Sequence, residues 1–248
     1  MKIAVIGNTV QTLKGLNRLV EEGYRVKYVF GLPEDKVAGK VNYVPLEDFC
    51  LEHDVFFDTS NDWNNLLEIE VDLVICLGDS RIVPESVLEK HKVIGNHGAI
   101  LPYVQGGASL TWGRMLNNGK WGISIMELDK VVDSGKILVT KEFSYAPDCS
   151  MCEFVEKADD LTIEALLEYL SGNYQSQENK KWNVKIARHT DSQFVTDVLR
   201  STLEQGKCIY LPPRRPVDGK IQKNWDDSFV EAFKMANDNP YPSWSNKE

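Results

Sequence analysis

His97 and Asp133 are the residues of this chain whose types and spacing best support chemistry. His97 and its neighbour Asn96 follow a short apolar run, in the stretch GNHGAILPYVQGG at residues 95–107, and Asp133 comes 36 residues after His97 in KVVDSGKIL. A carboxylate beside an imidazole can hold the ring in its charged form or take part in proton transfer. A carboxamide and an imidazolium aimed at one point can stabilise an oxyanion during acyl transfer.

A purely structural role for the same residues is the main alternative. A lone histidine after a strand is more often a hydrogen-bonded structural residue, and Asp133-Ser134-Gly135 also fits an ordinary turn. The choice between the two depends on whether the surrounding elements bring these side chains together.

The residues before His97 predict strands that alternate with helices. Lys2–Gly7 is an apolar run that ends in glycine, and apolar side chains then recur every three or four positions, as on the buried face of a helix. Gly23 is a typical C-terminal cap of that helix, and Arg25–Phe30 alternates as a strand does. We therefore predict an α/β fold, a Rossmann-like, mostly parallel sheet with helices on both faces and a short C-terminal extension. Further strands are expected at residues 55–57 and 71–77, and further helices at residues 46–52, 63–69 and 84–89.

Polar residues follow two of the predicted strands at their carboxyl ends. Gly78–Arg81 comes after residues 71–77, and Gly95–His97 comes after the next apolar run. Ligands of such sheets bind beyond the carboxyl ends of the central strands, so we expect both segments at one edge. After the first strand the chain has Gly7-Asn8-Thr9 instead of the GxGxxG fingerprint of dinucleotide-binding proteins.

Composition and charge argue against several classes of protein. With 248 residues, of which 42% are hydrophobic, the chain suits one α/β domain with a small appendage. The net charge of −9 argues against a large non-specific grip on nucleic acid, and the sequence has no apolar run of membrane-spanning length. MKIAVIG starts a strand and not a signal peptide, so we expect a cytoplasmic protein with reduced cysteines. Cys149 and Cys152 form a CxxC without a second ligand pair, so we expect no metal.

Three stretches taken together resemble the formyltransferase family that uses 10-formyltetrahydrofolate, which includes methionyl-tRNA, glycinamide-ribonucleotide and sugar-nucleotide formyltransferases. They are LVICLGDSRIVPESVL at 73–88, VIGNHGAILPYVQGGASLTWGRMLNNGKWGISIMELD at 93–129 and KVVDSGKIL at 130–138. The family pattern is Asn-x-His, Leu-Leu-Pro, an Arg-Gly loop, Gly-Val-Thr-x-x-x-x-Asp and Asp-x-Gly. Here it reads NHGAILP, GG, GISIMELD and DSG, with the family's spacing between histidine and aspartate. The resemblance covers about residues 1–171, and PPRRPVDGKI and NDNPYPSW add a weaker match.

The resemblance implies transfer of a formyl group from 10-formyltetrahydrofolate to an amine, without a metal. It implies that His97 stabilises the oxyanion with help from Asn96, and that Asp133 sets the charge of His97 and assists proton transfer. It also implies that the pterin binds between two loops and is recognised largely by backbone groups. The residues of these two loops are Ser80, Arg81, Ile82 and Val83 in the first, and Leu128, Asp129 and Val131 in the second.

The chain departs from the family pattern next to His97. With His97 and Pro102 in register, the family's asparagine falls on Gly95, and Asn96 comes one residue late. One step along an extended segment turns a side chain to the other face. Three outcomes follow: a local bulge brings Asn96 to the donor position, another group supplies the donor, or activity is weakened. We favour a bulge that lets Asn96 take part.

The residues after the matching region guide the prediction of the acceptor. We divide the chain into a catalytic domain at 1–172, a linker and packing segment at 173–207, and a C-terminal extension on the acceptor side at 208–248. That extension most resembles sugar-nucleotide formyltransferases, so we expect an amino sugar on a nucleoside diphosphate as the amine. The side chains predicted to bind it are Arg214, Arg215 and Gln105, the last standing where the family has arginine. A solvated polyproline-like stretch fits PPRRP equally well.

The sequence is compatible with other functions. Methionyl-tRNA formyltransferases carry a further β-barrel domain after the PYP segment, and with a net charge of −9 we disfavour tRNA. A formate-releasing hydrolase of this kind would carry an extra N-terminal domain, whereas MKIAVIG is at residue 1. Gly95 is also compatible with an inactive folate-binding relative. We expect no nucleic-acid and no membrane partner, and a homodimer is compatible with the sequence.

Overall fold

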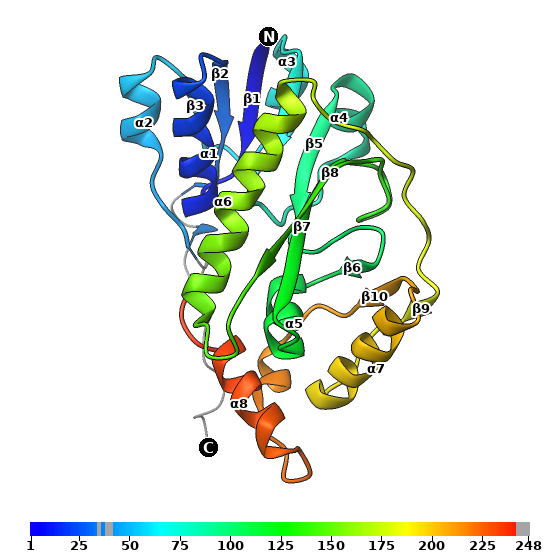
Figure 1. The fold of residues 1–248 in the computed structure, drawn as a ribbon. Helices are drawn as coiled ribbons and strands as arrows, with labels where there is room; N and C mark the ends of the chain where they lie inside the picture. The colour runs from blue at the N-terminus through cyan, green and yellow to red at the C-terminus, as the bar shows by residue number, and fades with distance from the viewer. Residues whose placement is uncertain (34–35, 38–41, 242–248) are drawn as a thin grey trace.

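The computed structural model describes residues 1–33, 36–37 and 42–241 (Figure 1). Strands and helices alternate through the first hundred residues, in the order that the sequence predicts. The strands are β1 (Lys2–Ile6), β2 (Arg25–Phe30), β3 (Phe56–Asp58), β4 (Leu73–Cys76), β5 (Val93–His97), β6 (Val104–Gly106), β7 (Lys120–Glu127), β8 (Ile137–Ser144), β9 (Val184–Lys185) and β10 (Ile209–Leu211). The helices are α1 (Val10–Glu21), α2 (Glu47–Glu52), α3 (Asn64–Glu68), α4 (Glu85–Lys90), α5 (Ser109–Leu116), α6 (Met151–Leu170), α7 (Ser192–Glu204) and α8 (Asp227–Ala236), with a 3-10 turn, η2, at Pro216–Gly219.

The larger sheet contains seven strands in the order β3-β2-β1-β4-β5-β7-β8. The first five pair in parallel, whereas β7 runs antiparallel to β5 and β8 runs antiparallel to β7. Parallel neighbours need a crossover that returns the chain to the same end of the sheet, and the helices between the first strands provide it. The prediction of a mostly parallel α/β sheet is confirmed.

Helices cover both faces of this sheet, and α6 crosses the front face in Figure 1. Strand β1 shows why its sequence is apolar throughout. Ile3 and Val5 belong to the apolar cluster with residues of α1 and α6, whereas Ala4 and Ile6 belong to the cluster with residues of α3 and α4. A parallel strand that is buried on both faces has a continuous apolar sequence for this reason.

The turn from β1 into α1 illustrates how local sequence sets the carboxyl edge of the sheet. Gly7 has φ +153°, and a Cβ there would lie 2.3 Å from the carbonyl oxygen of Leu77. Thr9 caps α1, since its hydroxyl accepts from the N–H of Thr12 while the Thr12 hydroxyl accepts from the N–H of Thr9. At the other end Gly23 follows the helix with φ +79°, as the predicted cap requires.

The chain after α6 packs onto the same body. Strands β6, β10 and β9 form a small parallel sheet, and α8 packs on α5 (Figure 1). Trp225, Phe229 and Phe233 are buried in one apolar cluster with Trp112 and Phe154, so residues from the extension and from the first 172 share a core. The domain boundaries remain a proposal. Residues 242–244 of the PYPSW motif lie outside the described residues.

Helix α7 lies in the segment that we interpreted as a linker, and the sequence analysis did not predict it. The stretch before it is strongly polar, as is typical of a loop. Asp191 caps α7, and Val195, Leu199 and Thr202 are buried at helical spacing, so the signal was present. Within the described ranges no helix combines the length and apolar character needed to span a bilayer.

Candidate active site

His97 ends β5 and lies inside the protein, with 7% of its surface exposed. It stands opposite Ser124 of β7. The ring Nε2 lies 3.0 Å from the carbonyl oxygen of Val104, and the ring Nδ1 lies 3.4 Å from Oδ1 of Asp133. Both partners are acceptors, so a ring that satisfies both must donate at both nitrogens and carry a positive charge. The arrangement therefore suits an imidazolium.

Asp133 comes from the loop between β7 and β8 and is as deeply buried as His97. Its Oδ1 faces His97, and its Oδ2 accepts a hydrogen bond of 2.8 Å from the N–H of Gly106. Asp133 has φ +56°, a left-handed conformation that its side chain makes unfavourable by about 1 kcal/mol. The loop must be held in place by its surroundings.

The two ring nitrogens of His97 differ in how closely their partners approach. The contact from Nε2 to Val104 has the length of a normal hydrogen bond, whereas 3.4 Å from Nδ1 to Asp133 is longer than usual for one. Val104 starts β6, which pairs with Ile209 of β10, so the small sheet fixes the carbonyl that orients the ring. The Nδ1 proton is thus the donor that a ligand can share.

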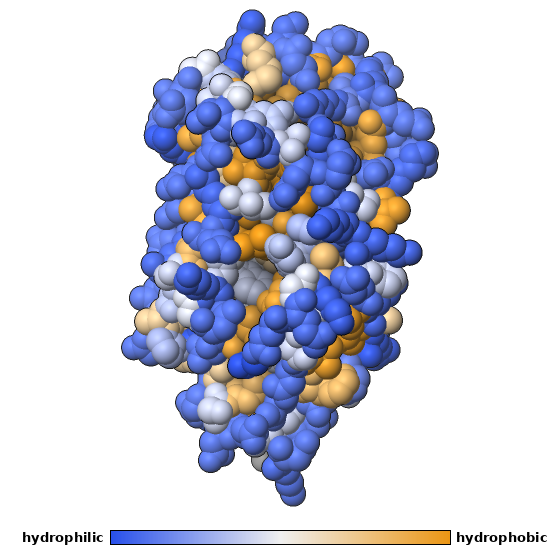
Figure 2. All heavy atoms as spheres, turned by 45° about the vertical axis from the view of Figure 1, so that its right-hand side comes forward, coloured by the Kyte–Doolittle hydropathy of each residue, from blue (hydrophilic) through white to orange (hydrophobic). Residues whose placement is uncertain are grey.

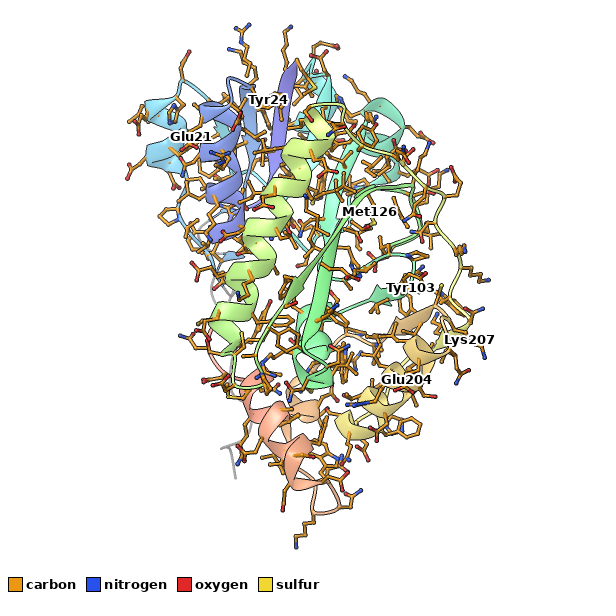
Figure 3. All side chains as sticks on the ribbon, in the orientation of Figure 1. Glu21, Tyr24, Tyr103, Met126, Glu204 and Lys207 are labelled. Carbon is orange, nitrogen blue, oxygen red and sulfur yellow. The ribbon has the colours of Figure 1, made fainter. Side chains whose placement is uncertain are left out.

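Asn96 lies on the other face of β5. Gly95, Asn96 and His97 pair with Met126, Ile125 and Ser124 of β7 in unbroken register, so the bulge that we expected is wrong. Met126, labelled in Figure 3, stands directly opposite Gly95. The side-chain oxygen of Asn96 accepts from the N–H of Gly78 at 3.3 Å.

Gly95 shares its face of the strand with His97. A Cβ at Gly95 would lie 2.9 Å from a terminal methyl of Leu128, so the Leu128 side chain fills the space in front of the glycine. Gly95 is not among the described glycines with positive φ. Its role is close packing against Leu128 and not an unusual backbone conformation.

The two loops predicted to hold the pterin lie side by side. Lys130 of the second loop forms an ion pair with Glu85, which comes two residues after the first loop. Ile82 and Val131 expose 70% and 65% of their surfaces, whereas Val83 is buried. Exposed apolar side chains on two adjacent loops next to a buried charged pair suit a flat aromatic ligand such as a pterin. Ser80 and Asp129 are exposed as well.

Arg81 has a different environment from the rest of its loop. Its guanidinium pairs with Asp79 at 2.7 Å, donates to the carbonyl oxygens of Gly31 and Phe30, and lies over the rings of Phe30 and Trp63. These contacts tie the first loop to the end of β2. Arg81 therefore supports the loop through its neighbours.

The cysteine at the end of β4 does not offer a nucleophile. Burial raises the pKa of the Cys76 thiol to about 12, and the Asp79 carboxylate adds to the shift. The thiol is therefore protonated at neutral pH.

Across the described ranges no three His, Cys, Asp or Glu side chains form a group that could hold a metal ion.

Gln105 is buried, and its amide contacts the protein itself. Its Nε2 donates to the carbonyl oxygen of Lys180 at 2.7 Å, and 3% of the residue is exposed. The prediction that Gln105 binds substrate directly is therefore wrong. It anchors residues 179–180 beside the site instead.

Asn179 is a residue that the sequence analysis missed. Its Nδ2 donates to the carbonyl oxygens of Asp133 at 2.9 Å and Gly135 at 3.0 Å, so it clamps the loop on both sides of the strained backbone. Its Oδ1 accepts from Lys180 and lies 3.4 Å from the amide of Gln105. A single asparagine in a polar stretch carries no sequence signal for this role.

Arg214 is half-buried, and its guanidinium contacts the protein itself. Its guanidinium donates to Ser192, to the carbonyl oxygen of Asp218 and to Asn237 at 2.9–3.0 Å. It also lies over the rings of Trp112 and Phe233. Burial lowers its pKa to about 10, which leaves the group charged at neutral pH.

These contacts give Arg214 a structural role, and its predicted role in phosphate binding stays a prediction. Both terminal nitrogens of its guanidinium already donate to acceptors within the fold, namely Ser192, Asp218 and Asn237. The neighbouring Arg215 is exposed, and its role in binding stays a prediction.

A cavity of about 440 Å³ lies on another side of the loop that follows His97. Tyr103, which lines this cavity, is labelled in Figure 3. Figure 2, which turns the right-hand side of Figure 1 forward, shows hydrophobic atoms at the surface in the middle of that face. The described residues that line the cavity do not include the His97–Asp133 pair. The walls of the cavity include Ile100, Tyr103, Val104, Lys120, Trp121, Glu142 and Leu203.

A sequence model of the formyl transferase family matches residues 1–170. The chain belongs to this family. A methionyl-tRNA formyltransferase of Alkaliphilus oremlandii is 31% identical over 94% of this chain and 81% of its own length. HypX from Aquifex aeolicus in complex with tetrahydrofolic acid shares the fold with a TM-score of 0.64 and 17% identity, over 98% of this chain and 35% of HypX. An N-formyltransferase from Helicobacter canadensis, solved with folinic acid and dTDP-3-aminofucose, has a TM-score of 0.66 and 13% identity, over 95% of this chain and 80% of its own.

The prediction of a formyltransferase is confirmed by the family match. The matched range contains both predicted pterin loops and both members of the His97–Asp133 pair. This formyltransferase spans about a third of the HypX chain, and the likeness to the solved structures concerns the fold. The roles of individual residues and the identity of the amine stay proposals.

Proposed function

We propose that this formyltransferase moves a formyl group from 10-formyltetrahydrofolate to the amine of an amino sugar carried on a nucleoside diphosphate. The observation that carries the proposal is the buried His97–Asp133 pair beside two loops with exposed apolar side chains. A charged imidazole with one shared proton is suited to an acyl transfer in which negative charge develops on oxygen. The folate supplies the activated formyl carbon, and His97 and Asp133 stabilise the charges that develop during the transfer.

The reaction requires a donor at the developing oxyanion and an acceptor for the amine's proton. As the amine nitrogen bonds to the formyl carbon, the carbonyl oxygen gains negative charge, and the Nδ1 proton of His97 stabilises it. The Val104 carbonyl keeps the ring oriented by holding Nε2. Asp133 stabilises the charged ring and takes part in moving the amine's proton toward the folate nitrogen, which leaves as the bond to the formyl carbon breaks.

The relatives of this chain support two different acceptors. The Helicobacter canadensis structure contains dTDP-3-aminofucose, which supports an amino sugar. The relative with 31% identity is a methionyl-tRNA formyltransferase, which supports methionyl-tRNA as the second candidate. The net charge of −9 favours the small acceptor, because tRNA binding depends on many phosphate contacts.

One experiment tests both the reaction and the acceptor. The protein is incubated with 10-formyltetrahydrofolate and, in separate reactions, with nucleoside-diphosphate amino sugars or with methionyl-tRNA, and products are examined by mass spectrometry. We expect a gain of one formyl group on an amino sugar, and loss of that gain in His97→Ala. Formylation of methionyl-tRNA alone would replace the amino sugar as acceptor. Tight folate binding without any formyl transfer would mean an inactive relative and overturn the proposal.

A further inference from the structure

The segment after Glu178 is basic in an otherwise acidic chain. Residues 179–190 contain Lys180, Lys181, Lys185 and Arg188 and no acidic residue, while the whole chain has a net charge of −9. None of the ion pairs between described residues includes one of these four side chains. The segment thus concentrates positive charge that the fold itself does not neutralise.

Two aromatic rings lie among these lysines. The ring centroids of Trp182 and Tyr210 are 6.2 Å apart, at an angle of 63°. The ammonium of Lys185 lies 5.2 Å from the Trp182 ring and 5.3 Å from the Tyr210 ring, and that of Lys181 lies 5.2 Å from the Trp182 ring. An exposed ammonium over a ring is held weakly, so these charges stay available to a ligand.

The small sheet links this cluster to the His97–Asp133 pair. Lys185, Tyr210 and Gln105 occupy matching positions on β9, β10 and β6, so their side chains project from one face of the small sheet. Ile209 and Leu211, which alternate with Tyr210, are buried in the apolar cluster behind. The row from Lys185 to Gln105 spans about 10 Å at the usual strand spacing.

The row ends beside the carboxylate of the site. The residue after Gln105 is Gly106, whose N–H holds Asp133. Burial raises the pKa of Tyr210, and the Asp133 carboxylate raises it further, as expected for a ring that faces the same region. A ligand on the lysines and rings would therefore extend toward the reacting groups.

We propose that Lys181, Trp182, Lys185 and Tyr210 form the binding site for a nucleoside phosphate that carries the acceptor amine. Lysines in an unneutralised cluster bind phosphate, and an aromatic ring binds a nucleobase by stacking. This binding site rests on the proposed function, which supplies the identity of the amine. The site lies on the outer face of the small sheet and not at Arg214, where the sequence analysis placed the acceptor. A nucleoside-diphosphate sugar and the aminoacylated end of tRNA share this chemistry.

Calorimetric titration of the purified full chain tests the site without any turnover. The probes are dTDP, UDP, inorganic pyrophosphate and a short RNA that ends in CCA. We expect Lys181→Ala/Lys185→Ala to weaken binding of dTDP and pyrophosphate about tenfold or more, because both probes use the lysines. Trp182→Leu should weaken dTDP about tenfold and leave pyrophosphate within about twofold, because only the nucleoside stacks.

A matched control keeps the test specific. Lys220→Ala/Lys223→Ala removes the same charge from exposed positions of the C-terminal extension and should leave all binding unchanged. Binding of dTDP or UDP without the RNA identifies a sugar nucleotide as the source, and binding of the RNA alone identifies tRNA. Failure of all four probes, or equal weakening by the control pair, overturns the site.

Folate binding separates this inference from the function on which it rests. Tetrahydrofolate should bind the wild type and Lys181→Ala/Lys185→Ala equally well, since the predicted pterin loops lie elsewhere. If tetrahydrofolate binds and the nucleotides do not, the acceptor site is wrong while the proposed reaction stands. If tetrahydrofolate does not bind the wild type, the proposed reaction is wrong whatever the nucleotides do.

Discussion

The half-buried Arg214 and the buried His97–Asp133 pair are two places where ionisable side chains pack inside this protein, and the sequence analysis assigned both to the functional site. The guanidinium of Arg214 has partners at 2.9–3.0 Å from Ser192, Asp218 and Asn237 and lies over two aromatic rings. His97 has one normal hydrogen bond and one long contact of 3.4 Å to Asp133. Both terminal nitrogens of Arg214 are paired within the fold, whereas the Nδ1 of His97 has only a long contact.

This difference distinguishes a structural charge from a functional one. A buried charge that stabilises the fold needs every donor paired, because unpaired buried donors are costly. A group that must stabilise a transient oxyanion needs a donor that the resting protein has not fully used. Variants of Arg214 should therefore lower mainly the stability of the fold, and variants of His97 should lower mainly turnover.

The largest effect on turnover is expected for His97→Ala. Removal of an oxyanion donor raises the barrier by about 3–4 kcal/mol, which is a fall of roughly a hundred- to a thousandfold in turnover. Tetrahydrofolate affinity should change little, and the free energy of unfolding should fall by less than in Arg214→Met, because the ring makes one hydrogen bond of normal length within the fold. Single-turnover kinetics, folate titration and thermal unfolding check this. A variant with a near-normal rate would remove His97 from the chemistry.

Arg214→Met is expected to show the reverse behaviour. The change keeps apolar volume but leaves acceptors on Ser192, Asp218 and Asn237 without their donor, so the free energy of unfolding should fall by about 2–4 kcal/mol. Turnover per folded molecule should stay within about threefold of wild type. Denaturant titration measures the loss, and exposed Arg215→Met is the matched control, with an expected change of about 0.5 kcal/mol or less. Equal losses at both arginines would contradict the comparison.

Asp133→Asn tests the long contact between the two members of the pair. The asparagine can present its oxygen to the N–H of Gly106 and its amide N–H to Nδ1 of His97, which makes Nδ1 an acceptor and the ring neutral. The reserved donor is then lost. We expect turnover to fall about ten- to a hundredfold. Nitrogen NMR of the His97 ring reports its protonation directly, and a ring that still carries both protons would refute this account.

Asn179→Ala should have a smaller effect, because Asn179 acts through Asp133. Without its amide, the carbonyl oxygens of Asp133 and Gly135 lose their clamp and the left-handed backbone at Asp133 relaxes. We expect turnover to fall about three- to tenfold through misplacement of the carboxylate. The NMR signals of His97 should shift as well, which a remote change in stability would not cause. Exposed Asn173→Ala is the control, and equal kinetic effects of the two changes would argue against the clamp.

The sheet could be predicted from the sequence because its strands are buried on both faces and its helices are capped by recognisable residues. Ile3 to Ile6 form a continuous apolar run, and Thr9 and Gly23 mark the ends of α1. The small sheet could not be predicted in the same way. Strand β9 has two residues and β10 has three, which is too short for any alternation to show.

The candidate site could be predicted only in part. His97 and Asp133 stand in a recognisable pattern, and the structure brings them together. The partners that orient them are the carbonyl of Val104, the N–H of Gly106 and the amide of Asn179. Backbone groups have no sequence signature. Arg214 shows the converse, since a pair of arginines after two prolines looks the same in sequence whether it faces a phosphate or a buried indole ring.

The smallest effects are expected at Asn96 and Gly95, where the two faces of β5 can be compared directly. Asn96 bonds the N–H of Gly78 at 3.3 Å on the face away from His97. Asn96→Ala should therefore cost about 1 kcal/mol of stability and change turnover by less than about threefold. A fall of a hundredfold in turnover would mean that Asn96 reaches the oxyanion after all. Melting temperature and single-turnover rate together decide between these outcomes.

Gly95 sets the corresponding test on the His97 face. A Cβ at this position would lie 2.9 Å from a terminal methyl of Leu128, and that methyl is the flexible end of the side chain. Gly95→Ala should therefore shift Leu128 in the second pterin loop and slow turnover about threefold. Gly95→Asn makes the same steric demand and adds an amide on the face of His97. We expect it to be slower than wild type but faster than Gly95→Ala, because the amide offers a second oxyanion donor. The ratio of the two rates isolates the amide from the steric cost, and equal rates would show that the donor role cannot be restored from this position.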